Sequence, residues 1–378
     1  MLVGIDFFDK DVVFTLIPIF SMKPDIEYLV CDKKDEKLVD SIVSAINIHE
    51  NNNVDVRTVF VDGDNFGDIE QKLEDVLKNE SKNEIYIDLT GGSELMNACG
   101  YKLGMKYNAR LLHVNFNDMI LNDVNSGQKV CDAVNISLYD YLEGIGAKRL
   151  PDSHIVPRED EYKDIVELAE LFFKNVDAWK KLHGRIANRP KTYKNGFPKA
   201  SFKNSEMIII NELLNRGYLI NRKSMYEFRD DKAKEYLITY GIWLEMYIYI
   251  KAKELYDEVE LGVVIDWNNH DGREGKDNEI DVIFMKNSIP VFISCKMTKP
   301  APLDICEVGF LTKRLSSQKG EAIVATTSHI KEVGNENNKG IHYKMKELHV
   351  GCIEVREFLT KSTTQVFEDE LKKMGVIR

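Results

Sequence analysis

The segment from Asn278 to Lys296, NEIDVIFMKNSIPVFISCK, combines residue types that suit phosphate chemistry. Its apolar runs on either side of a short polar turn predict a β-hairpin. Glu279 and Asp281 lie two residues apart, so both carboxylates project from one face of the first strand. Ser294 and Lys296 share a face of the second strand in the same way. Carboxylates suit Mg²⁺ or Mn²⁺ and a lysine suits developing negative charge, so the pattern indicates metal-assisted phosphoryl chemistry.

A helix predicted just upstream adds a further carboxylate. Residues 241–255, GIWLEMYIYIKAKEL, are apolar on nearly every side, which is typical of a buried helix. Glu245 falls within this surface, where an unpaired carboxylate is destabilising. The strand ELGVVID lies before the hairpin, and the helix ICEVGFLTKRLSSQ and the strand EAIVAT follow it. The plain alternatives are an exposed acid–lysine ladder on the hairpin and a surface ion pair for Glu245.

This order of elements and residues resembles the core of the PD-(D/E)xK nucleases, which have a restriction-endonuclease-like α/β fold. The resemblance implies a catalytic set of Glu245, Glu279, Asp281, Ser294 and Lys296. It also implies Mn²⁺ or Mg²⁺ as cofactor, with Asp281, Glu279 and Glu245 as the metal ligands. The family usually has Asp or Glu two residues before the lysine, where this chain has Ser294. Glu279 or Glu245 is therefore expected to replace the missing ligand.

Residues 1–150 alternate between apolar and amphipathic segments. The apolar segments predict strands at 1–8, 26–32, 54–62, 84–90 and 109–116. Helices are predicted between them, including 37–49, 69–79 and 96–107. This alternation predicts an α/β domain with a Rossmann-like, doubly wound parallel sheet, in which ligands bind at the carboxyl ends of the strands.

One of these strand ends carries the sequence DLTGGSELM, residues 88–96. A strand that runs through Thr90–Ser93 into a helix offers backbone N–H groups at the positive end of the helix dipole, which is an anion-binding arrangement. Gly91 and Gly92 allow the backbone to approach a phosphate closely. The plain alternative is a tight strand-to-helix connection without a ligand.

The turn resembles the signature of CARF domains, Rossmann-like sensors of cyclic oligoadenylate in type III CRISPR systems. The resemblance implies that the ligand-binding residues are Asp9, Lys10, Thr90, Gly91, Gly92, Ser93 and Met96. Family members more often carry a lysine where this chain has Glu94. Backbone donors, Thr90 and Ser93 are therefore expected to carry more of the phosphate binding.

Together the two resemblances match the CRISPR ancillary nucleases, in which a CARF domain is fused to a PD-(D/E)xK domain. They imply a homodimer that binds a cyclic oligoadenylate, with cyclic tetra-adenylate favoured, and then cleaves DNA, RNA or both. The alternative is a non-catalytic sensor or regulator whose nuclease core has decayed, which Ser294 would allow. A nucleotide-using α/β enzyme is disfavoured, because neither the P-loop nor the dinucleotide fingerprint is present.

The length of this chain, 378 residues, and the distribution of its charges fit a division into three parts. We expect a sensor domain at 1–150, a helical and basic linker with a possible winged-helix-like segment at 151–236, and a nuclease domain at 237–378. The first part holds 26 acidic and 15 basic residues and so carries the whole net charge of −11, which makes it a poor general nucleic-acid binder. Six scattered cysteines and an apolar fraction of 43% fit a cytoplasmic globular protein.

The segment from Lys174 to Lys203 is strongly basic, with nine Lys or Arg residues and one acidic residue. Trp179, Tyr193, Phe197 and Phe202 are interleaved with the basic residues. Positive charge with aromatic faces predicts a groove for nucleic acid. The alternative is a solvated helix face followed by a linker.

Overall fold

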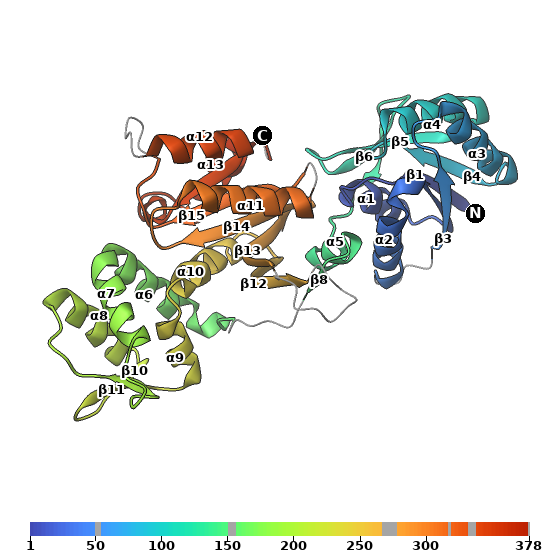
Figure 1. Cartoon of the computed structure of the whole chain (residues 1–378). Helices are drawn as coiled ribbons and strands as arrows, with labels where there is room; N and C mark the ends of the chain where they lie inside the picture. Colours follow the sequence, from blue (N-terminus) through green and yellow to red (C-terminus); the bar gives the residue numbers. More distant parts are fainter. Residues whose placement is uncertain (50–53, 150–155, 267–277, 317–318, 332–337, 377–378) are drawn as a thin grey trace.

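The structure is a computed structural model that describes residues 1–49, 54–149, 156–266, 278–316, 319–331 and 338–376. Figure 1 shows an N-terminal domain and a C-terminal domain, each built on a large sheet, and a mostly helical unit. The helical unit comes between the two domains in sequence. In space it lies beyond the C-terminal sheet, on the side away from the N-terminal domain (Figure 1).

The N-terminal domain has a seven-stranded sheet in the order β3-β2-β1-β4-β5-β6-β7. The first five strands in this order are parallel and the last two are antiparallel. The strands are β1 (Leu2–Phe7), β2 (Ile26–Asp32), β3 (Asp55–Val61), β4 (Glu84–Asp88), β5 (Arg110–Asn115), β6 (Ile120–Asp123) and β7 (Lys129–Asp132). The helices are α1 (Val13–Met22), α2 (Glu36–Ile48), α3 (Phe66–Asn79), α4 (Glu94–Tyr107) and α5 (Leu138–Gly144). The predicted Rossmann-like α/β fold is confirmed.

The C-terminal domain has a six-stranded sheet in the order β16-β15-β14-β13-β12-β8. Its elements are α10 (Ile242–Lys253), β12 (Val259–Asp266), β13 (Asn278–Lys286), β14 (Ile289–Lys296), α11 (Pro302–Leu315), β15 (Glu321–Thr326), α12 (Lys339–Leu348), β16 (Val350–Glu354) and α13 (Thr363–Met374). Val282 and Ile293 pack in the core that contains α10, whereas Ala322 and Val324 pack with α11. The predicted hairpin is present at the centre of the sheet, with a helix on each face.

The two domains meet through apolar and polar contacts. Strand β8 (Lys148–Arg149) pairs with β12, so the end of the expected sensor segment already belongs to the C-terminal sheet. One apolar cluster joins residues of α1 and α5 to residues of β12, β13 and β14. The Ile136 N–H donates to Ser288 Oγ at 2.9 Å across this junction. None of the described helices has the length and apolar character needed to cross a membrane.

The helical unit contains α6 (Tyr162–Lys174), α7 (Val176–Ala187), β9 (Gly196–Pro198), α8 (Asn204–Asn215), β10 (Leu219–Asn221), β11 (Met225–Phe228) and α9 (Asp231–Ile238). The three strands form a small sheet in the order β10-β11-β9, and α8 leads directly into the β10–β11 ribbon. This is the helix and ribbon that the sequence indicated as winged-helix-like.

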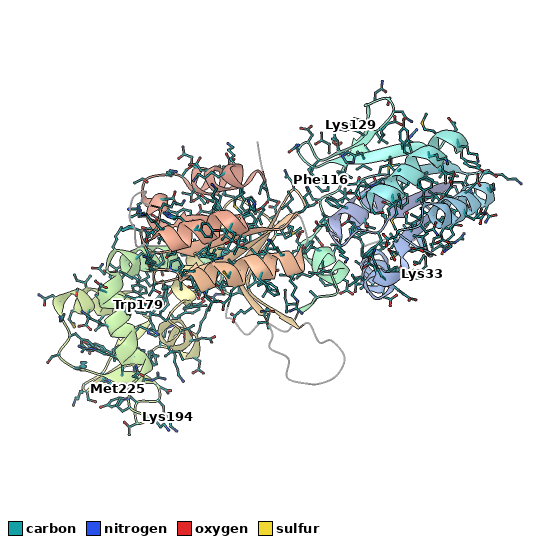
Figure 2. The ribbon with its side chains drawn as sticks, turned by 45° about the horizontal axis from the view of Figure 1, so that its top comes forward. Lys33, Phe116, Lys129, Trp179, Lys194 and Met225 are labelled. Carbon is teal, nitrogen blue, oxygen red and sulfur yellow. The ribbon has the colours of Figure 1, made fainter. Side chains whose placement is uncertain are left out.

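The basic segment of this unit differs from its prediction in one respect. Trp179 and Phe197 are 0% and 1% exposed, so both fill the core and neither offers a face to a base. The prediction of these two rings as stacking surfaces is therefore wrong. Lys191 and Lys194 are exposed, and Figure 2 shows Lys194 at the end of the unit that is farthest from the N-terminal domain.

Three acidic side chains are buried on neighbouring strands at the centre of the N-terminal sheet: Asp6, Glu27 and Asp88. The Tyr86 hydroxyl donates to Glu27 Oε2 at 2.8 Å. Burial raises the pKa of Glu27 to about 8 and that of Asp88 to about 7. Burial, with repulsion from the other two carboxyls, raises the pKa of Asp6 well above its usual value. The folded domain therefore holds protons that the unfolded chain releases at neutral pH.

The free energy of unfolding should consequently fall as the pH rises from about 4.5 to about 8, because the folded state binds more protons in this window. Glu27→Gln removes one titration and keeps an acceptor for Tyr86. Its stability should decline less than that of the wild type between pH 5 and 8, by on the order of 2 kcal/mol, since one pKa unit corresponds to about 1.4 kcal/mol.

Urea unfolding at pH 5, 6.5 and 8 measures this difference. Glu84→Gln is the control, because Glu84 lies exposed on the same strand as Asp88, so the stability of this variant should change with pH as that of the wild type does. If the free energy of unfolding changed with pH equally for Glu27→Gln and the wild type, Glu27 would not hold a proton in the folded state.

Candidate functional site

The hairpin brings Asp281 and Ser294 together where β13 and β14 stop pairing. The last backbone pair between these strands is Val282 with Ile293. Just beyond it, Asp281 Oδ2 accepts the Cys295 N–H at 2.6 Å and lies 3.5 Å from Ser294 Oγ. The Asp281 side chain therefore ties the two strands together at the point where the ladder ends, and this fixes its carboxylate.

Charged neighbours surround Asp281. Burial is the largest influence that raises its pKa, and Glu279 raises it further, whereas a backbone N–H and Lys296 lower it. Lys296 Nζ also lies 3.6 Å from Asp304 Oδ1, in the first turn of α11. Asp304 Oδ2 accepts the Ala301 N–H at 2.6 Å and so caps that helix. The lysine is thus held between carboxylates from β13 and from α11.

Glu245 and Glu279 approach this strand end from either side. Glu245 is half-buried on α10, where the other residues from 242 to 250 are buried. Burial raises the pKa of the Cys295 thiol, and the carboxylates of Asp281 and Glu245 raise it further. Glu245 therefore lies close to the strand position between Ser294 and Lys296. Glu279 is exposed near the start of β13.

The donor atoms at this strand end are hard oxygens, the kind that Mg²⁺ and Mn²⁺ take. Asp281 and Glu279 supply carboxylates and Ser294 supplies a hydroxyl. Among the residues that the structure describes, no three His, Cys, Asp or Glu side chains lie close enough to hold a metal ion together. The residues therefore fit a divalent ion that keeps several of its waters, and they do not form a closed protein shell.

The Thr90–Ser93 turn connects β4 to α4 at the carboxyl end of the N-terminal sheet. Thr90 Oγ1 donates to Asp88 Oδ1 at 2.8 Å and accepts the Val114 N–H at 2.9 Å, which ties the turn to the end of β5. Ser93 Oγ accepts the Met96 N–H at 3.2 Å and caps α4. Both hydroxyls thus hold the turn in shape, so backbone N–H groups at the start of α4 are its main anion donors.

Gly91 and Gly92 let the turn pack tightly against the protein itself. Gly92 has φ +79°, which disfavours other residues. A Cβ on Gly91 would lie 3.0 Å from the Phe7 carbonyl oxygen and 3.2 Å from Phe14 Cβ. Asp9 Oδ2 accepts the Gly92 N–H at 3.2 Å, so a carboxylate already uses one donor of the turn.

The remaining predicted ligand residues differ in accessibility. Lys10 is exposed, and its Nζ lies 3.5 Å from Asp35 Oδ1. Met96 is buried, and its Sδ would lie 3.6 Å from a Cβ on Gly92, so it supports the turn from inside. Glu94 is exposed at the start of α4.

The family model for the Card1 CARF domain matches residues 15–141. This range runs from α1 to α5 and contains the Thr90–Ser93 turn. This part of the chain is therefore similar to a CARF domain. No curated protein sequence matches the chain.

Three solved structures share the fold of the whole chain. Protein VC1899 from Vibrio cholerae has a TM-score of 0.80 at 14% identity, covering 99% of this chain and 97% of that chain. Can2 from Sulfobacillus thermosulfidooxidans, in complex with cyclic tetra-adenylate, has a TM-score of 0.72 at 15% identity and 99% coverage of both chains. A type III CRISPR defence DNA nuclease activated by cyclic oligoadenylate has a TM-score of 0.61 at 11% identity, covering 98% of this chain and 51% of that chain.

Two residues of interest escaped the sequence reasoning. Asp304 contacts Lys296, yet its only local signal is its place in the first turn of a helix. Asp11 is buried in the connection after β1, and its Oδ1 accepts the hydroxyl of Ser316 at 2.8 Å. These two residues are 305 positions apart in the chain, so no local pattern points to the contact.

The position of Ser294 leads to a prediction about metal binding. Ser294→Glu places a carboxylate beside Asp281, and added ligand charge strengthens binding of hard cations. We expect the affinity for Mn²⁺, measured by calorimetry, to rise by about tenfold or more. Ser294→Gln has a similar size without the charge and should give no gain. Equal Mn²⁺ affinity for the two variants would contradict a metal site at this position.

Proposed function

We propose that the chain is a metal-dependent nuclease of type III CRISPR defence that is activated by cyclic oligoadenylate, with cyclic tetra-adenylate as the favoured activator. The observation that carries this proposal is a CARF domain in direct contact with a sheet that bears Asp281 and Lys296 at one strand end. Can2 in complex with cyclic tetra-adenylate and the DNA nuclease activated by cyclic oligoadenylate support it, because they share the fold.

In this proposal Asp281 and Glu279 hold Mn²⁺ or Mg²⁺, with Glu245 on the opposite side of the strand end. A divalent cation bound there supplies Lewis acidity toward a phosphoryl oxygen and a water molecule. The Cys295 N–H keeps the Asp281 carboxylate in place. Lys296 stabilises the charge that develops on the phosphate, and Asp304 positions Lys296.

The activator binds at the Thr90–Ser93 turn, where N–H groups at the start of α4 face its phosphates. We further propose a homodimer, because a cyclic ligand with rotational symmetry matches two copies of one surface around a two-fold axis. The exposed lysines of the helical unit, including Lys191 and Lys194, then form a substrate-facing surface for the backbone of DNA or RNA.

A second function is favoured by one observation, the serine at position 294. Without a carboxylate there, the strand end has fewer charged ligands for a metal than the family pattern provides. The corresponding candidate is a non-catalytic sensor or regulator that binds the cyclic oligonucleotide and responds by a change of conformation. The retained Asp281, Glu279, Glu245 and Lys296 favour the nuclease.

The nuclease proposal predicts the effect of changing its central residues. Asp281→Asn keeps an acceptor for the Cys295 N–H and removes the charge, and Lys296→Met removes the cation. Each should lower cleavage by about a hundredfold to a thousandfold or more, as for other electrostatic stabilisers, while activator binding stays unchanged. Cleavage is measured on supercoiled plasmid and single-stranded RNA with Mn²⁺, with and without cyclic tri-, tetra- and hexa-adenylate.

Glu307→Gln is the control for this experiment, since Glu307 is exposed on α11 and should keep full activity. Full metal-dependent cleavage by Asp281→Asn would show that the reaction occurs elsewhere. A wild type that binds an activator and cleaves neither substrate with either metal would favour the non-catalytic sensor.

The ligand proposal predicts a charge effect at Ser93. Ser93→Asp keeps an oxygen that caps α4 and places a negative charge against the bound phosphate. Affinity for cyclic tetra-adenylate, measured by calorimetry, should fall by more than about tenfold, since like-charge contacts cost several kcal/mol. Ser93→Asn caps the helix without the charge and should bind within about threefold of the wild type. Unchanged affinity for Ser93→Asp would place the ligand site away from the turn.

A further inference from the structure

Lys319 belongs to the C-terminal domain, yet its ammonium group lies against the CARF domain. The residue lies between α11 and β15. Its Nζ lies 4.9 Å from the ring centre of Phe116 and 5.8 Å from that of Phe14. These two rings form an edge-to-face pair with their centres 5.3 Å apart. Figure 2 shows Phe116 on the side of the CARF domain that faces the C-terminal domain.

The two rings place Lys319 beside the Thr90–Ser93 turn. Phe14 lies against the turn, because a Cβ on Gly91 would be 3.2 Å from Phe14 Cβ. Phe116 directly follows β5, and the end of β5 is tied to the turn by the bond from the Val114 N–H to Thr90. Lys319 therefore lies at the carboxyl ends of β4 and β5, the edge of the sheet where doubly wound folds bind ligands.

The charged side chains around the turn are mainly negative, so a further cation is needed there to attract a phosphate. Asp9 and Glu94 bring negative charge to it, and Lys10 is paired with Asp35. Lys319 is half-buried, and no acidic side chain among the described residues lies within ion-pair distance of it. A cation–π contact contributes about 0.5–2 kcal/mol, which is less than a charged hydrogen bond can contribute, so the ammonium can turn from the rings toward a phosphate.

We propose that Lys319 is a ligand-binding residue, contributed by the C-terminal domain, whose ammonium binds a phosphate of the cyclic oligoadenylate held at the turn. This inference rests on the proposed ligand.

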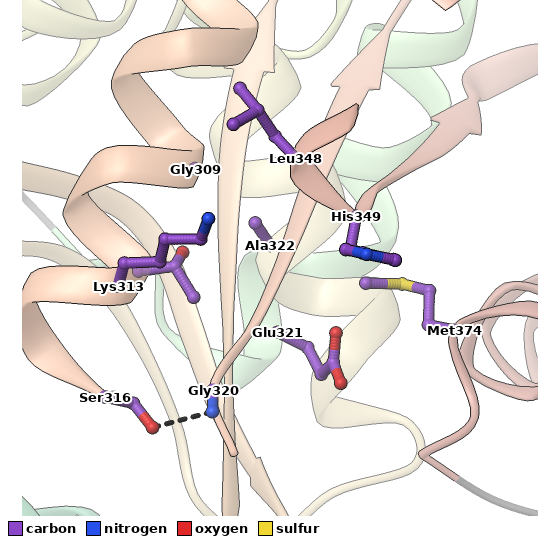
Figure 3. A pocket seen from close by; sticks show the side chains of 10 residues that line it. Gly309, Lys313, Ser316, Gly320, Glu321, Ala322, Leu348, His349 and Met374 are labelled. Atoms are coloured by element: carbon purple, nitrogen blue, oxygen red, sulfur yellow. Dashed lines mark hydrogen bonds between the residues drawn. The ribbon is translucent and has the colours of Figure 1, made fainter. Parts of the chain in front are cut away.

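Binding by Lys319 also connects the ligand to α11. The residue follows the end of that helix, where the Ser316 hydroxyl donates to Asp11 at 2.8 Å. Ser316 Oγ also accepts the Gly320 N–H at 2.6 Å (Figure 3), so the residues on both sides of Lys319 are fixed to one another. A ligand that binds Lys319 therefore contacts the segment that follows α11, and the first turn of the same helix lies beside Lys296.

The test measures binding of cyclic tetra-adenylate by calorimetry for the wild type, Lys319→Gln and Lys319→Arg. Lys319→Gln should weaken binding by about tenfold to a hundredfold, the usual loss when a hydrogen bond to a charged group is removed. Lys319→Arg keeps the charge and the contact with the rings, so it should bind within about threefold of the wild type. The affinity of the wild type should fall more steeply with added NaCl than that of Lys319→Gln, which a purely structural contact would not produce.

Lys313→Gln is the matched control, because Lys313 is an exposed lysine on α11 (Figure 3) and, within the described part of the chain, makes no cation–π contact with Phe14 or Phe116. Thermal unfolding without ligand checks that the variants fold. Equal affinity and equal salt dependence for Lys319→Gln and the wild type would overturn the role of Lys319 while leaving the proposed function intact. A wild type that binds none of the cyclic tri-, tetra- and hexa-adenylates would overturn both.

Discussion

The buried carboxylate of Asp11 fixes how the CARF domain and the C-terminal domain meet. Asp11 is 1% exposed, and its Oδ1 accepts the Ser316 hydroxyl at the end of α11. Nearby, the buried Tyr141 hydroxyl donates to the Leu315 carbonyl at 2.7 Å. The apolar cluster around these bonds supplies the buried area, but apolar contacts tolerate small rotations. Buried polar groups do not, because losing a partner costs roughly 1–3 kcal/mol, so these bonds select one orientation.

In this orientation α11 runs between the two candidate sites. The helix has 14 residues and is therefore about 21 Å long. Its first turn holds Asp304 against Lys296, and its end is bonded to the connection after β1, which also carries Asp9. A ligand can favour an active arrangement only if it binds that arrangement more tightly. A contact that the ligand makes within one CARF domain gives no preference for the position of the C-terminal domain, whereas a contact with Lys319 depends on where that domain lies.

The sequence predicted the elements that local patterns specify and missed the contacts that depend on distant parts of the chain. Alternating apolar residues identified the hairpin that carries Asp281 and Lys296, and the Gly-Gly turn was visible because its glycines are local. Trp179 was misjudged because a basic helix with a buried face shows the same interleaving of lysines and aromatic rings as a nucleic-acid groove. Asp11 and Ser316 are far apart in sequence, and only the packing of two domains brings them together.

The serine at position 294 changes how a metal would be held, even though it leaves the fold intact. The nuclease pattern that the hairpin resembles has a carboxylate at this position, and here a hydroxyl lies 3.5 Å from Asp281 instead. Burial and Glu279 both raise the pKa of Asp281 and so disfavour its charged form, which a nearby cation would stabilise. In the proposed nuclease, fewer protein charges mean that more of a bound metal's coordination would come from water and from the phosphate of a substrate. Metal and substrate would then bind interdependently, so any change that brings the substrate closer to β13 and β14 would also strengthen metal binding. Interdependence of this kind would make the proposed site sensitive to small movements of α11, whose Asp304 Oδ1 lies 3.6 Å from Lys296 Nζ.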